Sequence, residues 1–185
     1  ESLAIIVTSI AWVPLVLLFA IAIKLESKGP AFFIQRRVGR GGKEFNMIKL
    51  RSMRTDSEVH GAQFAGENDS RITKIGKLIR KVRIDEVPQF INVLKGDMAL
   101  IGPRPEQKAF VQEFEEKIPL YTLRHIVKPG ITGWAQVTHG YADNEESTKE
   151  KLAHDFYYVK NLSLWLDIVV TVKTIKTMLS GFGAR

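Results

Sequence analysis

The segment SLAIIVTSIAWVPLVLLFAIAI, residues 2–23, carries no charged side chain. As one straight helix that rises about 1.5 Å per residue, it would reach ~33 Å, which is enough to cross a bilayer. It is too long, and has the wrong flanks, for a secretory signal. The sequence therefore predicts a membrane helix, and hydropathy alone favours a single spanning helix.

Pro14 lies near the middle of this segment, where it removes one backbone donor and pushes against the carbonyl of Ile10. We expect a break there, with the hydroxyls of Thr8 and Ser9 available to satisfy freed carbonyls. A large bend would leave two halves too short to span, and the segment would return to the face it entered as a re-entrant hairpin. Under either form, the basic residues that follow predict that the downstream domain lies on the cytoplasmic side. These residues are Lys24, Lys28, Arg36, Arg37 and Arg40.

The rest of the 185-residue chain is long enough for one compact domain with its own core. The absence of cysteine excludes disulfides and thiolate metal sites. The net charge of +7 is clustered: residues 36–54 hold seven basic side chains and one acid, and residues 71–83 hold six basic side chains and no acid. Such clustering favours polyanionic partners, namely nucleic acid, an anionic membrane surface or phosphorylated small molecules.

The pattern of apolar and turn residues predicts an α+β fold that is mostly α. Residues 31–37 and 44–50 read as two strands of a small β-hairpin, joined by the glycine-rich turn 39–42. We expect helices over residues 72–84, 86–94, 105–117, 145–160 and 162–179, and rigid loops at 102–105 and 129–134. The chain then divides into a membrane element, residues 1–28, and a single domain, residues 29–185.

The last predicted helix is amphipathic and allows two interpretations. Its apolar stripe consists of Leu164, Ile168, Val172, Ile175 and Leu179. This stripe could pack against the core. Alternatively, the helix could lie in a membrane interface, with Trp165 at headgroup level and with Lys173 and Lys176 facing anionic lipid.

The stretch Ile84-Asp85-Glu86-Val87-Pro88-Gln89 places two adjacent carboxylates directly after the basic segment. A carboxylate can attack phosphorus and form an acyl phosphate, which divides one displacement into two. Asp85 and Glu86 could also hold Mg²⁺, a hard ion that takes few protein carboxylates and shares its other positions with substrate phosphate and water. The pair is therefore a candidate for both catalysis and metal binding.

Several cations are candidates for binding phosphate next to this pair. Arg104 lies between two prolines, so its guanidinium can be presented at little ordering cost. Arg80 comes five residues before Asp85, and Lys49 and Arg51 end the second predicted strand. The sequence alone does not show that these groups converge.

Each of these features also has a simpler explanation. An acidic pair after a basic helix is commonly a surface ion-pair arrangement, and Arg104 could buttress a turn. The glycine-rich turn 39–42 matches neither a Walker A motif nor a dinucleotide fingerprint. The four histidines have no metal-ligand spacing.

Seven sequence blocks, taken together and in order, resemble the bacterial sugar transferase family, the monotopic polyprenyl-phosphate phosphoglycosyltransferases. The blocks are KGPAFF (28–33), QRRVG (35–39), KLRSM (49–53), DEVPQ (85–89), NVLKGDM (92–98), GPRP (102–105) and KPGITGWAQV (128–137). The ending from YYVKN (157–161) onward is similar to the exopolysaccharide-type members.

This resemblance implies a reaction and the substrates for it. A UDP-sugar would give its sugar 1-phosphate to undecaprenyl phosphate, releasing UMP and making the first membrane-linked intermediate of a surface glycan. The expected partners are therefore the UDP-sugar, undecaprenyl phosphate and membrane lipid, with no nucleic acid. The expected location is the cytoplasmic face of the bacterial inner membrane. Homo-oligomerisation stays open, as does the identity of the sugar.

The resemblance also implies roles for individual residues. Asp85 would be the nucleophile that carries the phospho-sugar, with Glu86 assisting it and Mg²⁺ bound to the pair. Arg80 and Arg104 match family positions expected to contact phosphate, and Lys128, which opens the last block, is a further candidate for phosphate binding. The membrane segment would be a re-entrant helix-break-helix around Pro14.

The chain departs from the family pattern at two places. The family usually has serine before the membrane proline and aspartate near the start of the helix, where this chain has Val13 and Glu1. Many members also have an Asn-Gly pair with a nearby arginine where this chain reads Thr138-His139-Gly140-Tyr141. The competing hypothesis is a non-catalytic basic module that binds anionic lipid or nucleic acid at a membrane surface. Residues 71–83 contain no aromatic side chain for base stacking, which argues against nucleic acid.

Overall fold

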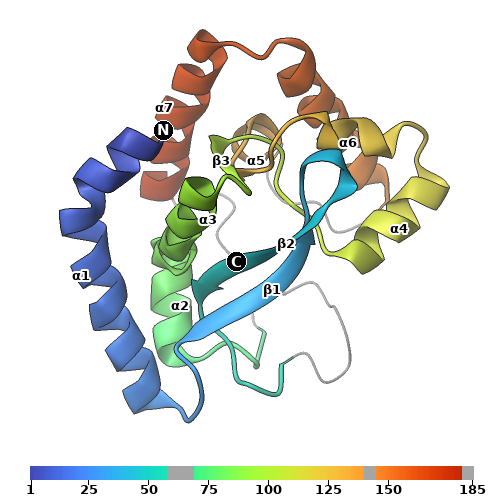
Figure 1. The fold of residues 1–185 in the computed structure, drawn as a ribbon. Coiled ribbons are helices and arrows are strands. Elements are labelled where there is room, and N and C mark those ends of the chain that lie inside the picture. Colours follow the sequence, from blue (N-terminus) through green and yellow to red (C-terminus); the bar gives the residue numbers. More distant parts are fainter. Residues whose placement is uncertain (58–68, 140–144, 181–185) are drawn as a thin grey trace.

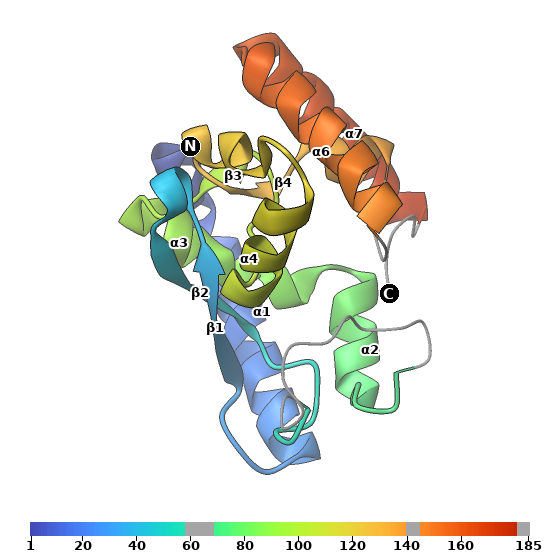
Figure 2. The ribbon, with the colours of Figure 1, turned by 90° about the vertical axis from the view of Figure 1, so that its right-hand side faces the viewer.

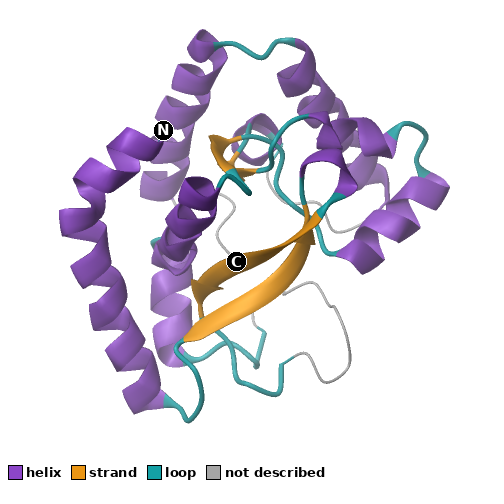
Figure 3. Cartoon of the chain, viewed as in Figure 1, coloured by secondary structure: helices purple, strands orange, loops and turns teal. Residues whose placement is uncertain are grey.

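The structure is a computed structural model that describes residues 1–57, 69–139 and 145–180 (Figure 1). Its long elements are the helices α1 (Ser2–Glu26), α2 (Lys74–Lys81), α4 (Lys108–Lys117), α6 (Glu145–Lys160) and α7 (Leu164–Ser180) and the strands β1 (Phe32–Val38) and β2 (Glu44–Leu50). The short ones are α3 (Phe90–Lys95), α5 (Trp134–Thr138), β3 (Ala99–Ile101), β4 (Gly130–Thr132) and the 3₁₀ helices η1 (Arg40–Gly42), η2 (Ile84–Gln89) and η3 (Tyr121–Ile126). The expected class, mostly helical with a small antiparallel sheet, is confirmed (Figure 3).

The predicted hairpin is present, one residue away from the expected start of its first strand. β1 pairs with β2 in antiparallel register, with Phe33 opposite Lys49 and Arg37 opposite Phe45. Gly41 and Gly42 have φ of 66° and 75°, a left-handed backbone that glycine adopts without steric cost. Because side chains alternate along a strand, this register places Arg37 and Lys49 on the same face of the hairpin.

The break expected at Pro14 is instead a bend within one helix. α1 contains Pro14 in its interior, and Figure 1 shows the helix axis changing direction part of the way along. The expectation for Thr8 was also wrong, since its hydroxyl donates to the carbonyl of Ala4 at 2.8 Å, six residues before Ile10, whose carbonyl the proline frees. A proline can be accommodated in this way when packing holds the helix on both sides of the lost hydrogen bond.

The two halves of α1 pack into different parts of the core. In the first half, Ile5 is buried in a cluster with Met47, Val93 and Met98. In the second half, three residues of α1 are buried beside β2 and α2; this second cluster comprises Val16, Ala20, Ile23, Ala31, Leu50 and Ile79. α1 therefore lies along the domain, as its position beside α2 and α3 in Figure 1 shows.

Polar contacts fasten α1 at both ends as well. At the start, a carboxylate oxygen of Glu1 accepts a hydrogen bond from the Leu100 backbone N–H at 3.2 Å. At the end, the Glu26 carboxylate accepts from the backbone N–H groups of Lys74 and Ile75 at 2.8 Å and 3.1 Å. These two N–H groups begin α2 and have no partner within that helix, so Glu26 caps it.

A short parallel pair, β3 and β4, was not predicted from the sequence. It forms where the two expected rigid loops meet, and glycines make the approach possible. A Cβ on Gly130 would lie 2.1 Å from the Gly102 nitrogen, and a Cβ on Gly133 would lie 2.2 Å from the Gly102 oxygen. Only glycine allows backbones to come this close, and the contact holds the loop that carries Arg104.

The helical predictions differ from the structure in detail. Residues 86–94, expected as one helix, form η2 followed by α3, and the helix expected from Pro105 begins only at Lys108. η3 and α5 were not predicted. α6 has the predicted bounds. In the view of Figure 2, α2 and α7 lie on the same side of the hairpin.

The stripe of α7 that could have packed against the core faces outward instead. Leu164, Ile168, Val172 and Ile175 are all exposed, whereas Leu166 and Val170 are buried. Packing therefore uses a neighbouring line of the helix, and the expectation that the stripe itself packs is wrong. The side chain of Leu179 lies outside the described residues.

Candidate active site

The acidic pair is placed by a sharp change of direction between two helices. Thr73 caps the start of α2, with its side chain accepting from the Gly76 N–H, and the helix ends at Lys81. Arg83 then adopts a left-handed conformation, φ 55° and ψ 22°, before η2 begins. A non-glycine residue in this region is uncommon and is often found where a site dictates the backbone. The turn brings Asp85 and Glu86 into the first turn of η2.

Five of the predicted site residues come together around this turn. The Glu86 carboxylate accepts a hydrogen bond from the Arg104 guanidinium, and the two form an ion pair. Arg80, Lys49 and Arg104 all exert an electrostatic influence on Asp85. The group draws on β2, the end of α2, η2 and the loop after β3, so the convergence that the sequence left open is present in the fold.

The two neighbouring carboxyls differ in their proton affinity. Burial raises the pKa of Asp85 to about 7, helped by the negative charge of Glu86 and opposed by the nearby cations. Burial also acts to raise the pKa of Glu86, but the charge and hydrogen bond of Arg104 outweigh it and lower that pKa below its ordinary value. Glu86 is therefore a fixed anion, whereas Asp85 has not fully ionised at neutral pH without a further cation.

Lys49 and Arg37 make the site more cationic than its carboxylates alone would require. Burial, together with the charges of Arg37 and Arg104, lowers the pKa of Lys49 to about 8. Lys49, Arg80 and Arg104 thus place three positive charges near the two carboxylates. Arg37 was missed as a site residue, although the hairpin register could have found it, since it shares the face of Lys49.

Two of the expected phosphate ligands lie elsewhere. The Arg51 guanidinium donates to the carbonyl oxygens of Lys28 at 2.8 Å and Ser27 at 2.9 Å, at the end of α1. It thereby satisfies carbonyls that a helix end leaves free. The exposed Lys128 side chain extends over the turn after α3, with its Nζ 3.7 Å from where a Cβ on Gly96 would lie. The Arg51 contacts place its guanidinium at the end of α1, whereas phosphate binding by Lys128 stays a prediction.

The acidic pair fits Mg²⁺, although it offers only two carboxylates. Among residues 1–57, 69–139 and 145–180 there is no group of three or more His, Asp or Glu side chains that could hold a metal. Mg²⁺ often binds through one or two carboxylates and completes its shell with water and substrate phosphate. Asp85 is buried beside another carboxyl and its pKa is raised, so a bound cation would stabilise its ionised form. Glu86, already paired with Arg104, would be the lesser ligand.

The loop that departs from the family pattern is only partly described. Thr138 ends α5, where its hydroxyl donates to the Trp134 carbonyl at 2.7 Å. The His139 ring stacks on that of His154 with 5.8 Å between centroids. Residues 140–144 lie outside the described residues, so the expectation for sugar or nucleotide contacts there stays a prediction.

Comparison with known proteins agrees with the blocks found in the sequence. A family model described as bacterial sugar transferase matches residues 1–181. The chain is 62% identical over 172 residues to UDP-N-acetylgalactosamine-undecaprenyl-phosphate N-acetylgalactosaminephosphotransferase of Aeromonas hydrophila, covering 93% of this chain and 41% of that protein. It is 46% identical over 176 residues to UDP-glucose:undecaprenyl-phosphate glucose-1-phosphate transferase of Xanthomonas campestris pv. campestris, covering 93% and 36%. An Escherichia coli K12 protein with that same name is 41% identical, covering 88% and 35%. The chain thus spans about two fifths of the length of these relatives.

Proposed function

This chain belongs to the bacterial sugar transferase family, and we propose that it transfers a sugar 1-phosphate from a UDP-sugar to undecaprenyl phosphate. The relatives' names give this reaction for those proteins, with N-acetylgalactosamine in one and glucose in others. The observation that carries the proposal for this chain is the pair of buried Asp85 and half-buried Glu86 among Lys49, Arg80 and Arg104. A carboxylate with three cations nearby suits attack on a diphosphate.

The transfer proceeds in two displacements at phosphorus. In the first, an Asp85 carboxylate oxygen bonds to the phosphorus that bears the sugar, and the bond from that phosphorus to the bridging oxygen breaks. The bridging oxygen leaves with its electron pair on UMP, and the sugar phosphate stays on Asp85 as an acyl phosphate. In the second, a phosphate oxygen of undecaprenyl phosphate bonds to the same phosphorus. The Asp85 carboxylate then leaves, and undecaprenyl-diphosphate-sugar is released.

The surrounding side chains hold and neutralise the reacting phosphates. Arg104, fixed by Glu86, presents the rest of its guanidinium to phosphate oxygens, and Arg80 and Lys49 add positive charge nearby. Mg²⁺ bound at Asp85 and Glu86 would neutralise charge on the diphosphate and on the leaving UMP. The cations also favour the ionised, attacking form of Asp85.

The contacts that hold both ends of α1 against the domain support a re-entrant membrane element, which enters and leaves the bilayer on one face. By length and composition α1 could cross a bilayer. However, Glu1 at its start and Glu26 at its end both contact the domain that carries the site. A spanning helix would have one end on the far side of ~30 Å of hydrocarbon, out of reach of that domain. The bend at the proline and the two fastened ends therefore favour a helix that enters and leaves the membrane on one face.

Two exposed apolar surfaces suit contact with lipid. On α1 the exposed apolar residues include Leu3, Ile6, Val7, Ile10, Leu17, Leu18, Ile21 and Leu25. On α7 they include Leu164, Trp165, Ile168, Val172, Ile175 and Met178. Apolar patches of this extent are rare on proteins surrounded by water alone. The α7 surface supports the interfacial interpretation of that helix, with a lipid acceptor brought to the site from the membrane.

The test is a screen of UDP-sugars with detergent-dispersed undecaprenyl phosphate and Mg²⁺, measuring UMP. We expect UMP release with at least one donor and loss of release when EDTA is added. A matched reaction without undecaprenyl phosphate should give at most one UMP per protein. No release from any donor, together with binding to anionic vesicles, would favour the non-catalytic membrane module instead.

The topology is tested separately with single cysteines, which the chain allows because it has none of its own. Cysteines at residues 1 and 27 should react with an impermeant maleimide from the same side of sealed inverted vesicles. Labelling from opposite sides would establish a spanning helix.

A further inference from the structure

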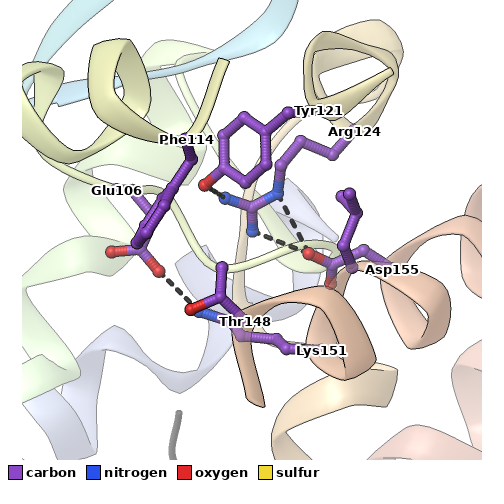
Figure 4. Close-up of a pocket in the computed structure, with 8 residues that line it drawn as sticks. Glu106, Phe114, Tyr121, Arg124, Thr148, Lys151 and Asp155 are labelled. Atoms are coloured by element: carbon purple, nitrogen blue, oxygen red, sulfur yellow. Dashed lines mark hydrogen bonds and ion pairs between the residues drawn. The ribbon is translucent and has the colours of Figure 1, made fainter. Parts of the chain in front are cut away.

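A second buried ionic group lies behind the loop that carries Arg104. It is centred on Arg124 of η3, as Figure 4 shows, and all three nitrogens of this guanidinium are engaged. Nε donates to the Asp155 carboxylate at 3.0 Å, with a second contact from NH2 at 2.7 Å, and NH1 donates to the Tyr121 hydroxyl at 2.9 Å. The side chains of Arg124 and Asp155 are only 2% and 3% exposed, so substrate does not reach them.

The remaining contact connects this group to the active site. Arg124 NH2 donates to the backbone carbonyl oxygen of Arg104 at 2.8 Å. The side chain of that same Arg104 donates to Glu86. One continuous series of charge-assisted bonds thus runs from α6, through Asp155, Arg124 and Arg104, to the acidic pair.

The loop is otherwise stiff, which makes this contact effective. Pro103 and Pro105 flank Arg104 and restrict its backbone on both sides. Next to them, Arg37 donates to the Pro105 carbonyl at 3.1 Å and Val38 donates from its backbone N–H to the Glu106 carbonyl at 2.9 Å. The Arg104 carbonyl is therefore one of three successive carbonyls that the domain holds in place.

We propose that Arg124, itself held by Asp155, is a positioning residue that fixes the backbone of Arg104 so that its guanidinium meets both Glu86 and the donor phosphate. This inference rests on the proposed function. Lysine at position 124 would keep the charge, but its single ammonium has no planar fork to serve Asp155 and the Arg104 carbonyl at once. A misplacement of the order of 1 Å in a phosphate-binding group can cost about 100-fold in rate.

The alternative is that Arg124 and Asp155 only hold η3 to α6, and a double-mutant cycle separates the two roles. UMP release is measured for wild type, Arg124→Lys, Arg104→Gln and the double variant, with kcat and KM determined for the donor. If Arg124 acts through the Arg104 side chain, Arg124→Lys should lower kcat/KM by about 10- to 100-fold in wild type. In the Arg104→Gln background the same change should cost less than about 3-fold, because the group that it positions is gone.

Equal losses in both backgrounds would overturn the proposal, since a purely structural role lowers activity by the same factor whatever stands at position 104. A melting temperature that falls with no loss of kcat/KM would also overturn it. If Arg124→Lys does not fold, Tyr121→Phe replaces it in the cycle, because it removes one bond to Arg124 and no charge. The same non-additivity is then expected, with a smaller loss.

Glu113→Gln serves as the matched control, since Glu113 forms an exposed ion pair with Lys117 on α4, away from this group. It should leave UMP release unchanged in both backgrounds. Absence of UMP release from the wild-type protein would instead overturn the proposed function, and this inference with it. An active wild type with an additive cycle would overturn this inference alone.

Discussion

Asp85 and Glu106 are both buried carboxyls with 9% of their surface exposed, yet their pKa values move in opposite directions. Burial raises the pKa of Asp85 to about 7. Burial acts in the same sense on Glu106, but Lys151, Arg124 and Arg37 outweigh it and lower that pKa to about 2. The difference lies in direct partners. The Glu106 carboxylate forms ion pairs with Lys151 at 2.5 Å and with Arg37 at 3.5 Å. Asp85 instead has a second carboxyl as its neighbour in the chain.

This contrast separates a carboxylate that supports the fold from one that is available for chemistry. A buried anion with close cations is already stabilised and gains little by reacting. A buried carboxyl without that compensation gains from a metal ion and from a phosphoryl group, which both offset its charge. Proteins commonly carry such destabilising groups at functional sites.

The largest expected effect is on activity at the uncompensated carboxyl. Asp85→Asn keeps the shape of the side chain but removes the proposed nucleophile, so UMP release should fall by at least about 10³-fold. Glu86→Gln, which leaves the nucleophile in place, should retain a small measurable rate. Full turnover by Asp85→Asn would show that the two buried carboxyls do not differ in the way described above.

The next effect is on stability at the compensated carboxyl. Glu106→Gln leaves Lys151 and Arg37 buried without their anion and should lower the free energy of unfolding by about 3 kcal/mol, measured by urea denaturation at pH 7. Because the pKa of Glu106 is lowered in the fold, its contribution is present above pH 4.5 and is lost as pH falls towards 2. A difference from wild type that persists unchanged at pH 2 would contradict this.

A smaller effect of opposite sign is expected from Asp85→Asn on stability without metal. The folded state holds the Asp85 proton up to about pH 7, whereas the unfolded chain releases it near pH 3.8. The free energy of unfolding of the wild type is therefore lowered increasingly between pH 4 and pH 7. The variant lacks this titrating group, so above pH 7 its free energy of unfolding should be higher by roughly 1–4 kcal/mol. Thermal unfolding in EDTA should show a higher melting temperature for Asp85→Asn at pH 8 and little difference at pH 4. A less stable variant at pH 8 would refute the raised pKa.

The smallest effect on stability is expected at Glu113, an exposed carboxyl that serves as the reference for Asp85 and Glu106. Glu113 pairs with Lys117 at 2.7 Å, but both side chains are 49% exposed. Glu113→Gln should change the free energy of unfolding by less than about 0.5 kcal/mol, and that change should shrink further in 1 M salt. A cost like that of Glu106→Gln would mean that burial does not explain the difference between the ion pairs.

The elements that the sequence predicted well are those with local signals. The hairpin follows from alternating side chains and a glycine turn, and α6 from its helical period, so both were found nearly to the residue. The pair β3 and β4 was missed because strands of three residues have no period to read, and their pairing depends on the close approach of Gly102 and Gly130.

The sequence predicted the chemistry of the site but not all of its residues. Asp85, Glu86 and Arg104 were named from charge pattern and proline flanks, and the fold brings them together. Arg51 was predicted to bind phosphate, but its guanidinium donates to the Lys28 carbonyl, a partner 23 residues earlier that nothing local in the sequence indicates. Arg124 was missed because its partners, at positions 104 and 155, are distant in the chain.

In the proposed reaction, the buried carboxylate of Asp85 attacks the sugar-bearing phosphorus. Intact-protein mass spectrometry after incubation with Mg²⁺ and an active UDP-sugar, without lipid acceptor, tests it most directly. We expect a mass increase equal to one sugar phosphate, localised to Asp85 by peptide mapping and discharged by undecaprenyl phosphate. Product formation at the normal rate with no adduct at Asp85 under single-turnover conditions would contradict it.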